Sequence, residues 1–218
     1  MFSSYPIMEN YPKCSTVGVI QTHLPHTIID TIRKECFAYN NTIKQANTFN
    51  NNTNYRKTFI KGISSYEWFA GMLWHYISRA NRENFLFDIT CLENEGLNYL
   101  IYPPGHYYHW HQDQALTSCL RPTTLPSVYN STINESLTVE HQWIRKISFS
   151  LQLTDSNDYT GGDLQFHNNN YTKEGVITAP REKGSLIIFD SRLSHRVTRV
   201  REGTREALVG WLLGPRWK

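Results

Sequence analysis

Residues 97–113 read LNYLIYPPGHYYHWHQD, and this stretch decides the fold class. Two short runs of β character, 97–102 and 106–113, are separated by two prolines and a glycine, which favour a turn. Six similar runs follow with no helical pattern between them, at residues 144–153, 163–167, 175–180, 184–190, 195–200 and 205–214. Eight strands in about 120 residues without intervening helices predict an antiparallel sandwich, barrel or jelly roll.

The region before residue 96 has a different pattern. Ile28, Ile32 and Cys36 recur at helical spacing after Pro25, which predicts a helix over residues 25–38. A second helix is predicted over residues 65–82, with a Ser-x-x-Glu capping box at its start and an apolar stripe of Phe69, Leu73, Trp74 and Ile77. We therefore expect one domain over 1–218, in which a mainly helical support region (1–95) precedes a β core (96–218).

Composition excludes several classes of protein. The chain has 218 residues, 39% hydrophobic and 19% charged, which is typical of a globular protein rather than a disordered one. The net charge of +3 is too mild to indicate a nucleic-acid or membrane partner, and no apolar run is long enough for a membrane span. The N-terminus lacks the features of a signal peptide, so we expect the cytoplasm, or the host cytoplasm if the source is a virus.

Residues 114–142 interrupt the β core with a stretch rich in Ser and Thr that contains two prolines. A loop of this length inside a compact domain is usually functional. We expect it to form a lid that closes over an extended peptide.

His111 and Asp113 lie at the end of a predicted strand, two residues apart, so their side chains should project from the same face. An imidazole and a carboxylate supply two of the three ligands in the facial triad of non-haem iron(II) oxygenases. The third must come from another strand, and His195 follows the buried run 184–190. His109 shares the strand parity of His111, which makes it a candidate for a supporting role or for a decoy ligand.

Arg205 opens the last predicted strand and shares one face with Ala207, Val209 and Trp211. A cation on an inward face needs an anion. A dicarboxylate cosubstrate that chelates the metal would provide one through a bidentate pair.

Three blocks of the chain together resemble the 2-oxoglutarate/Fe(II)-dependent dioxygenases, and within them the prolyl 4-hydroxylase-like branch. YPPGHYYHWHQD (102–113) is similar to the Y-x-x-G…Y-x-x-H-x-D motif of that family. RKISFSLQLTD (145–155) with GGDL (161–164) resembles its next core strand and Gly-Gly turn, and residues 184–211 resemble its distal His/Arg motif. The resemblance covers about 97–213 and implies an α+β, mainly β fold. This fold is a double-stranded β-helix, or jelly roll, with N-terminal helices packed on the major sheet.

The resemblance also implies roles for individual residues. The iron ligands would be His111, Asp113 and His195. The cosubstrate 2-oxoglutarate would contact Arg205 and Tyr102. The prolyl substrate site would be shaped by Tyr108, Arg145 and Trp211. One position departs from the family, because Gln152 stands where several members have a tyrosine that also contacts the distal carboxylate.

The implied activity is hydroxylation of a proline in a peptide or protein. Fe(II) would be the cofactor, 2-oxoglutarate and O₂ the cosubstrates, and ascorbate a reductant. Succinate and carbon dioxide would be the other products. Within the same chemistry, the alternatives are another side chain, a free amino acid or a small metabolite, while the mild charge disfavours repair of alkylated nucleic-acid bases. An alternative of another class is a non-catalytic jelly-roll binding module, which would not need all of His111, Asp113, His195 and Arg205.

Overall fold

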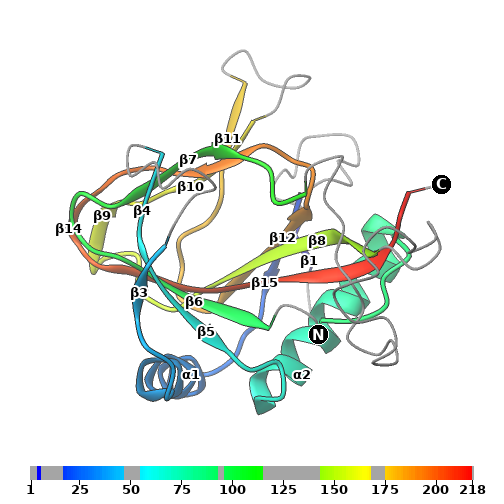
Figure 1. Cartoon of the computed structure of the whole chain (residues 1–218), viewed down its shortest axis with the longest axis horizontal. Helices are drawn as coiled ribbons and strands as arrows, with labels where there is room; N and C mark the ends of the chain where they lie inside the picture. Colours follow the sequence, from blue (N-terminus) through cyan, green and yellow to red (C-terminus); the bar gives the residue numbers. More distant parts are fainter. Residues whose placement is uncertain are drawn as a thin grey trace, which may run out of the picture.

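The computed structural model describes residues 4–5, 17–46, 55–92, 96–114, 143–167 and 175–217. Three layers are stacked in it (Figure 1). Helices α1 (His26–Ala38) and α2 (Trp68–Ala80) cover one face of a larger sheet, and a smaller sheet faces the other side. This is the predicted jelly roll with its N-terminal helices on the major sheet. Within the described residues, no helix is long and apolar enough to cross a membrane.

The larger sheet contains strands that lie far apart in the sequence, as the β-helix topology requires. Every pairing in it is antiparallel, and β8 and β15 form its longest ladder. In spatial order its strands are β1 (Ser4–Tyr5), β2 (Val17–Gln21), β12 (Ser185–Asp190), β8 (Trp143–Gln152), β15 (Arg205–Pro215), β6 (Leu97–Tyr102), β5 (Phe59–Ile63) and β3 (Lys44–Gln45).

The smaller sheet closes the other side of the jelly roll. In spatial order its strands are β11 (Val176–Thr178), β10 (Leu164–His167), β13 (His195–Val197), β7 (Tyr107–His111) and β4 (Arg56–Lys57). A separate pair joins β14 (Val200–Gly203) to β9 (Tyr159–Gly161), so the run predicted over 195–200 is in fact split between two sheets. The close approach at this split requires Gly161, whose φ is +72° and whose added Cβ would lie 2.1 Å from the carbonyl oxygen of Arg199.

The N-terminal region corrects one expectation. Both predicted helices are present, and a short π-helix, Asn81–Phe85, follows α2. However, β1 to β5 also come from residues before 96, so this region contributes strands to the β core as well as helices. Its strands extend both sheets and were missed because short pairings such as β5 with β6 depend on a distant partner. The capping box is also absent, because α2 begins after Glu67 without a side-chain cap.

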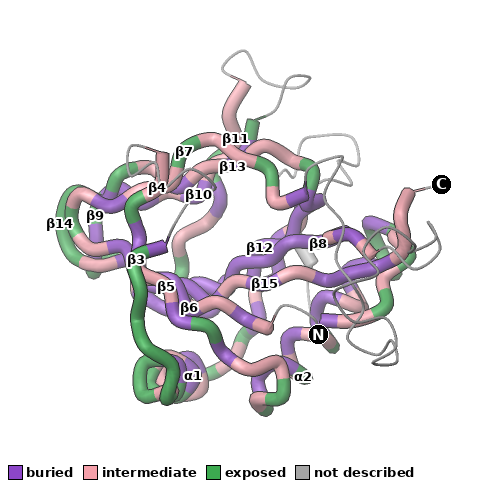
Figure 2. The backbone as a smooth tube through the Cα atoms, viewed as in Figure 1, coloured by how far each residue is buried: buried purple, intermediate pink, exposed green. Residues whose placement is uncertain are grey.

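The larger sheet has a hydrophobic core on each face. Toward the helices, fully buried side chains of α1 and α2 pack against the sheet: Ile29, Ile32, Cys36, Phe69, Leu73 and Ile77 with Leu97, Ile147 and Leu208. Toward the smaller sheet, the buried side chains are Val19, Leu100, Leu164, Phe166, Ile187, Phe189 and Val197. Figure 2 shows this burial along the central strands and the exposed outer side of α1. Each such side chain contributes roughly 1.5–3 kcal/mol, so the two cores hold the three layers rigidly together.

Candidate active site

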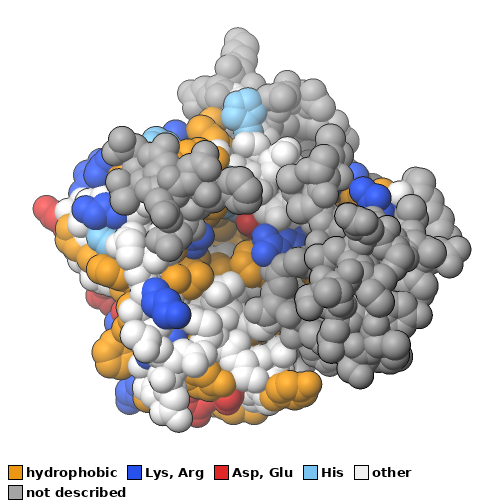
Figure 3. Space-filling model, in the orientation of Figure 1, with side chains coloured by type: hydrophobic (Ala, Val, Ile, Leu, Met, Phe, Trp, Pro, Cys, Tyr) orange, Lys and Arg blue, Asp and Glu red, His pale blue; other side chains and the backbone are white. Residues whose placement is uncertain are grey.

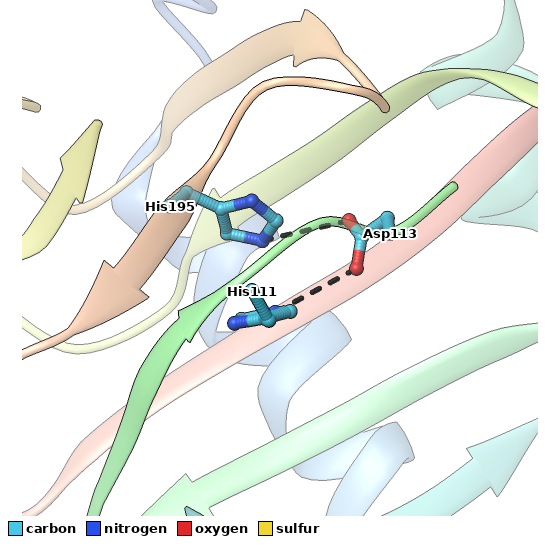
Figure 4. A group of neighbouring side chains, drawn as sticks. All are labelled: His111, Asp113 and His195. Atoms are coloured by element: carbon cyan, nitrogen blue, oxygen red, sulfur yellow. Dashed lines mark ion pairs between the residues drawn. The ribbon is translucent and has the colours of Figure 1, made fainter. Parts of the chain in front are cut away.

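Strand pairing brings the two predicted histidine ligands together. β7 and β13 are antiparallel, and their register places His195 directly opposite His111. Asp113 follows the end of β7, where its backbone N–H donates to the carbonyl of Ser191, 3.0 Å away. The carboxylate therefore points between the two imidazoles (Figure 4). His111 Nε2 lies 3.7 Å from Asp113 Oδ1, and His195 Nε2 lies 3.6 Å from Oδ2.

Backbone carbonyls orient both imidazoles. His111 Nδ1 lies 2.8 Å from the carbonyl oxygen of His109, and His195 Nδ1 lies 3.0 Å from that of Leu193. A carbonyl can only accept, so each Nδ1 carries a proton, which leaves Nε2 as the nitrogen that a metal can bind. The Nε2 atoms are the ones that face Asp113. A hydrogen bond from Nδ1–H to a backbone carbonyl is the contact that usually orients a metal-binding histidine.

The charges of the three groups suit a cation. Burial, helped by the nearby His195, lowers the pKa of His111 to about 3, so its imidazole is neutral at neutral pH. Burial alone would raise the pKa of Asp113, but the two histidines and hydrogen bonds from Ser148 and Trp211 lower it overall. The cluster therefore contains the neutral imidazole of His111 and the carboxylate of Asp113, and both suit a divalent cation.

This donor set fits a divalent iron ion. The three ligand atoms lie within 4.8 Å of one another. The separations of 3.6 and 3.7 Å are too long for hydrogen bonds, yet shorter than two metal–ligand bonds of about 2.1 Å end to end. Two histidines and one carboxylate on a rigid sheet are the protein ligands of the facial triad, which leaves other coordination positions open.

A cavity of about 180 Å³ extends from the triad between the two sheets. Figure 3 looks onto this hollow, where hydrophobic, acidic and basic side chains meet. The structure brings all eight residues proposed from the sequence to its wall: Tyr102, Tyr108, His111, Asp113, Arg145, His195, Arg205 and Trp211.

Arg205 is a buried cation that forms no ion pair in the part of the chain that the structure describes. Its side chain is 2% exposed, and its Nη2 donates to Gln152 Oε1 at 3.0 Å. Its guanidinium carbon lies 5.4 Å from the ring centre of Tyr102. Among the described residues, no carboxylate forms an ion pair with Arg205. A buried guanidinium is costly unless an anion pairs with it, so the cavity wall favours an anionic ligand here.

Tyr108, Trp211 and Arg145 surround the triad. The Tyr108 ring stacks on His111 with ring centroids 3.5 Å apart, and burial raises the pKa of its hydroxyl to about 12. The Arg145 guanidinium lies 3.8 Å above the Trp211 ring, and its Nη1 donates to the backbone carbonyl of Asp113 at 2.9 Å. These contacts fix the ligand carboxylate and shape the side of the cavity nearest the metal position.

Comparison with known proteins agrees with this geometry. The model of the 2OG-Fe(II) oxygenase superfamily matches residues 97–213, which is more than half of the chain. The chain belongs to the 2OG-Fe(II) oxygenase superfamily. Iron(II), 2-oxoglutarate and O₂ are the cofactor and cosubstrates of this superfamily, and the matched range contains the triad and Arg205.

Curated relatives of this superfamily member match over a shorter stretch. A PKHD-type hydroxylase of Rippkaea orientalis is 37% identical over 70 residues, which is 32% of this chain and 30% of the relative. One from Acaryochloris marina is 41% identical over 66 residues, covering 30% of this chain and 28% of the relative. The chain thus covers less than a third of the length of these relatives.

Solved structures share the fold over almost the whole chain. A prolyl-4-hydroxylase of Pseudomonas putida superposes with a TM-score of 0.63 at 17% identity, covering 93% of this chain and 94% of that one. A prolyl hydroxylase of Trichoplax adhaerens, in complex with a hypoxia inducible factor peptide fragment, gives 0.66 at 16% identity, covering 92% and 84%. At these identities the likeness concerns the fold.

Some features of this superfamily member could not be predicted from its sequence. Arg56 of β4 lines the cavity, with its guanidinium carbon 4.4 Å above the ring centre of Tyr108, and no motif pointed to it. The His109 side chain is exposed and contacts Tyr55 and Tyr107. It is therefore not a ligand, although its carbonyl orients His111. Apart from Gln114, the lid expected over 114–142 lies outside the described residues.

Proposed function

We propose that this superfamily member is a 2-oxoglutarate- and Fe(II)-dependent hydroxylase that acts on a proline in a peptide. One observation carries the proposal: a triad of two imidazoles and one carboxylate lines the same cavity as a buried guanidinium that has no ion pair within the described residues. A binding module would not need both a metal site with open positions and a separate anion site. We further propose that residues 1–218 act as one domain, because β2 and β5 extend the same sheet that carries β15.

The residues would divide the work as follows. His111, Asp113 and His195 hold the iron, which supplies the site where 2-oxoglutarate and O₂ react. Arg205 binds the distal carboxylate of 2-oxoglutarate, and Tyr102 lies beside that guanidinium. Hydrophobic side chains from both sheets keep water from the cavity, and a dry site strengthens these charge interactions.

A peptidyl substrate is supported by the relatives and by the cavity. Prolyl hydroxylases share the fold, and one of them was solved with a peptide fragment. Tyr108 and Trp211 lie near the metal position and contribute aromatic side chains to the cavity wall, which a pyrrolidine ring can contact. Arg145, held by Trp211 and by the Asp113 carbonyl, can donate to a peptide carbonyl.

Succinate formation tests this proposal. Protein is incubated in air with iron(II), ascorbate and 2-oxoglutarate, with and without a proline-rich peptide, and compared with His111→Ala. The proposal predicts peptide-stimulated succinate in the wild type, none in the variant, and a 16 Da gain in the peptide. Absence of turnover in the iron-loaded wild type with every substrate class would contradict the oxygenase assignment.

A small carboxylic acid, such as a free amino acid, is the second candidate substrate. It is favoured by Arg56, whose Nε is buried without a hydrogen-bond partner in the described structure and whose side chain lines the cavity. In the same assay, turnover stimulated by free proline or another amino acid, but not by the peptide, would select this candidate.

A further inference from the structure

Three buried polar side chains form a chain of hydrogen bonds in the wall of the cavity. Arg205 Nη2 lies 3.0 Å from Gln152 Oε1, and Gln152 Nε2 lies 3.1 Å from Ser150 Oγ. Arg205, Gln152 and Ser150 are 2%, 2% and 4% exposed. Arg205 and Ser150 line the cavity, and Gln152 connects them from behind.

The chemistry of arginine fixes the direction of this chain. A guanidinium has only donors, so the amide atom that faces Arg205 must be the oxygen of Gln152. The amide nitrogen of Gln152 then faces Ser150 and donates to its hydroxyl oxygen. Gln152 thus bridges its two neighbours, and one of its two amide protons remains unused by them. Gln152 is not among the residues that line the cavity, so this second proton does not face a ligand bound there.

The same direction leaves the Ser150 hydroxyl proton available. Its oxygen accepts from Gln152, and no other hydrogen bond of this side chain is present among the described residues. Ser150 pairs with Val209 across the β8–β15 ladder, between the Ser148–Trp211 pair beside Asp113 and the Gln152–Ala207 pair that leads to Arg205. The hydroxyl thus lies between the metal end and the guanidinium end of the cavity.

We propose that Ser150 donates a hydrogen bond to the distal carboxylate of 2-oxoglutarate, beside Arg205. Gln152 holds Arg205 and Ser150 in place but does not contact the cosubstrate. This inference rests on the proposed function, because it requires 2-oxoglutarate to bind in this cavity.

Calorimetric titration of the manganese(II)-loaded protein under nitrogen tests the inference without turnover. Wild type, Ser150→Ala and Ser150→Thr are each titrated with 2-oxoglutarate and with 2-oxobutyrate, which lacks the distal carboxylate. Ser185→Ala is the matched control, since Ser185 is a fully buried serine on β12 that bonds Gln21 outside the cavity. A hydrogen bond to a carboxylate predicts that Ser150→Ala weakens 2-oxoglutarate binding about tenfold.

The ligands separate the possible outcomes. Support requires that Ser150→Ala leaves 2-oxobutyrate affinity unchanged, that Ser150→Thr restores most of the 2-oxoglutarate affinity, and that Ser185→Ala binds like the wild type. Equal 2-oxoglutarate affinity in the wild type and Ser150→Ala would overturn the role of Ser150 and leave the proposed function intact. An equal loss for both ligands would overturn it as well, because the hydroxyl would not act on the distal carboxylate. A wild type that binds no 2-oxoglutarate would overturn the proposed function together with this inference.

Discussion

Arg205 and Glu206 are neighbours on β15, and both are buried, but their side chains lie on opposite faces of the larger sheet. On the helix side, Glu206 accepts hydrogen bonds from Arg33 Nε at 2.7 Å, from Arg33 Nη2 at 2.6 Å and from the Tyr99 hydroxyl. On the cavity side, the side chain of Arg205 has one hydrogen bond among the described residues, to the neutral Gln152. Within this part of the chain the carboxylate has a charged partner and the guanidinium has none.

The difference separates a structural charge from a ligand-binding one. The contacts of Glu206 join α1 to the sheet, and the pKa of Arg33 is raised, chiefly by its hydrogen bonds to this carboxylate. Arg205 lines the cavity, so its guanidinium N–H groups can donate hydrogen bonds to a dicarboxylate bound there. Changes on the cavity side should therefore alter ligand binding, and changes on the helix side should alter stability.

The largest effect is expected at the triad. Asp113→Ala removes the only charged ligand, so we expect succinate formation to fall at least about a thousandfold and iron(II) binding to be lost. The pKa of Asp113 is lowered overall in the folded protein, so its carboxylate also stabilises the fold, and the metal-free variant should unfold at a modestly lower temperature than the wild type. A strongly destabilised variant would show instead that Asp113 belongs with Glu206 among the structural charges.

Gln152→Glu converts the open site into a paired one. The new carboxylate would lie at hydrogen-bond distance from Arg205 and occupy its donors, so we expect 2-oxoglutarate affinity to fall about a hundredfold. Stability should stay the same or rise. Calorimetry and chemical denaturation measure the two quantities. Unchanged affinity would mean that Arg205 is not the anion site.

Glu206→Gln probes the helix side. Loss of the charge weakens three hydrogen bonds, and we expect the free energy of unfolding in urea to fall by about 2 kcal/mol. Affinity for 2-oxoglutarate should change less than twofold. Glu202→Gln, at an exposed position on β14, is the control and should leave both quantities unchanged. A large loss of affinity in Glu206→Gln would erase the distinction between the two faces.

The smallest effect concerns pH. The folded protein holds the pKa of His111 at about 3, far below the usual value of 6.5, so on acidification the unfolded chain takes up a proton that the folded chain refuses. This group therefore contributes stability above pH 6.5 that is lost as the pH falls. When the pH is lowered from 6.5 to 5.5, the free energy of unfolding in urea should fall by about 1 kcal/mol more in the metal-free wild type than in His111→Gln. Parallel losses would show that His111 is not buried as neutral imidazole.

Much of the cavity side could be predicted from the sequence. Its residues lie on strands with clear alternation, and short motifs connect them, so Arg205 and Trp211 were placed on one face correctly. Which side chains of β7 face the cavity could not be predicted. His111 pairs with His195 but Tyr108 pairs with Val197, so β7 has an extra residue there, and Tyr108 and His111 face inward while His109 turns out.

The helix side and the N-terminal contribution were harder to foresee. Arg33 and Glu206 are 173 residues apart, and each is an ordinary polar residue in its own segment. Arg56 reaches the cavity because β4 pairs with β7, a contact set by tertiary packing and not by local pattern. Such pairings depend on the assembled sheets, which local patterns in the sequence do not specify.

Anaerobic addition of 2-oxoglutarate to the iron(II)-loaded protein, followed by visible absorption, tests the central claim most directly. Chelation of iron(II) by a 2-oxo acid produces a charge-transfer band. We expect the band to appear in the wild type, to need far more 2-oxoglutarate in Gln152→Glu, and to be absent in Asp113→Ala. A wild type that binds iron(II) at this triad but develops no band at any 2-oxoglutarate concentration would contradict the assignment of this cavity.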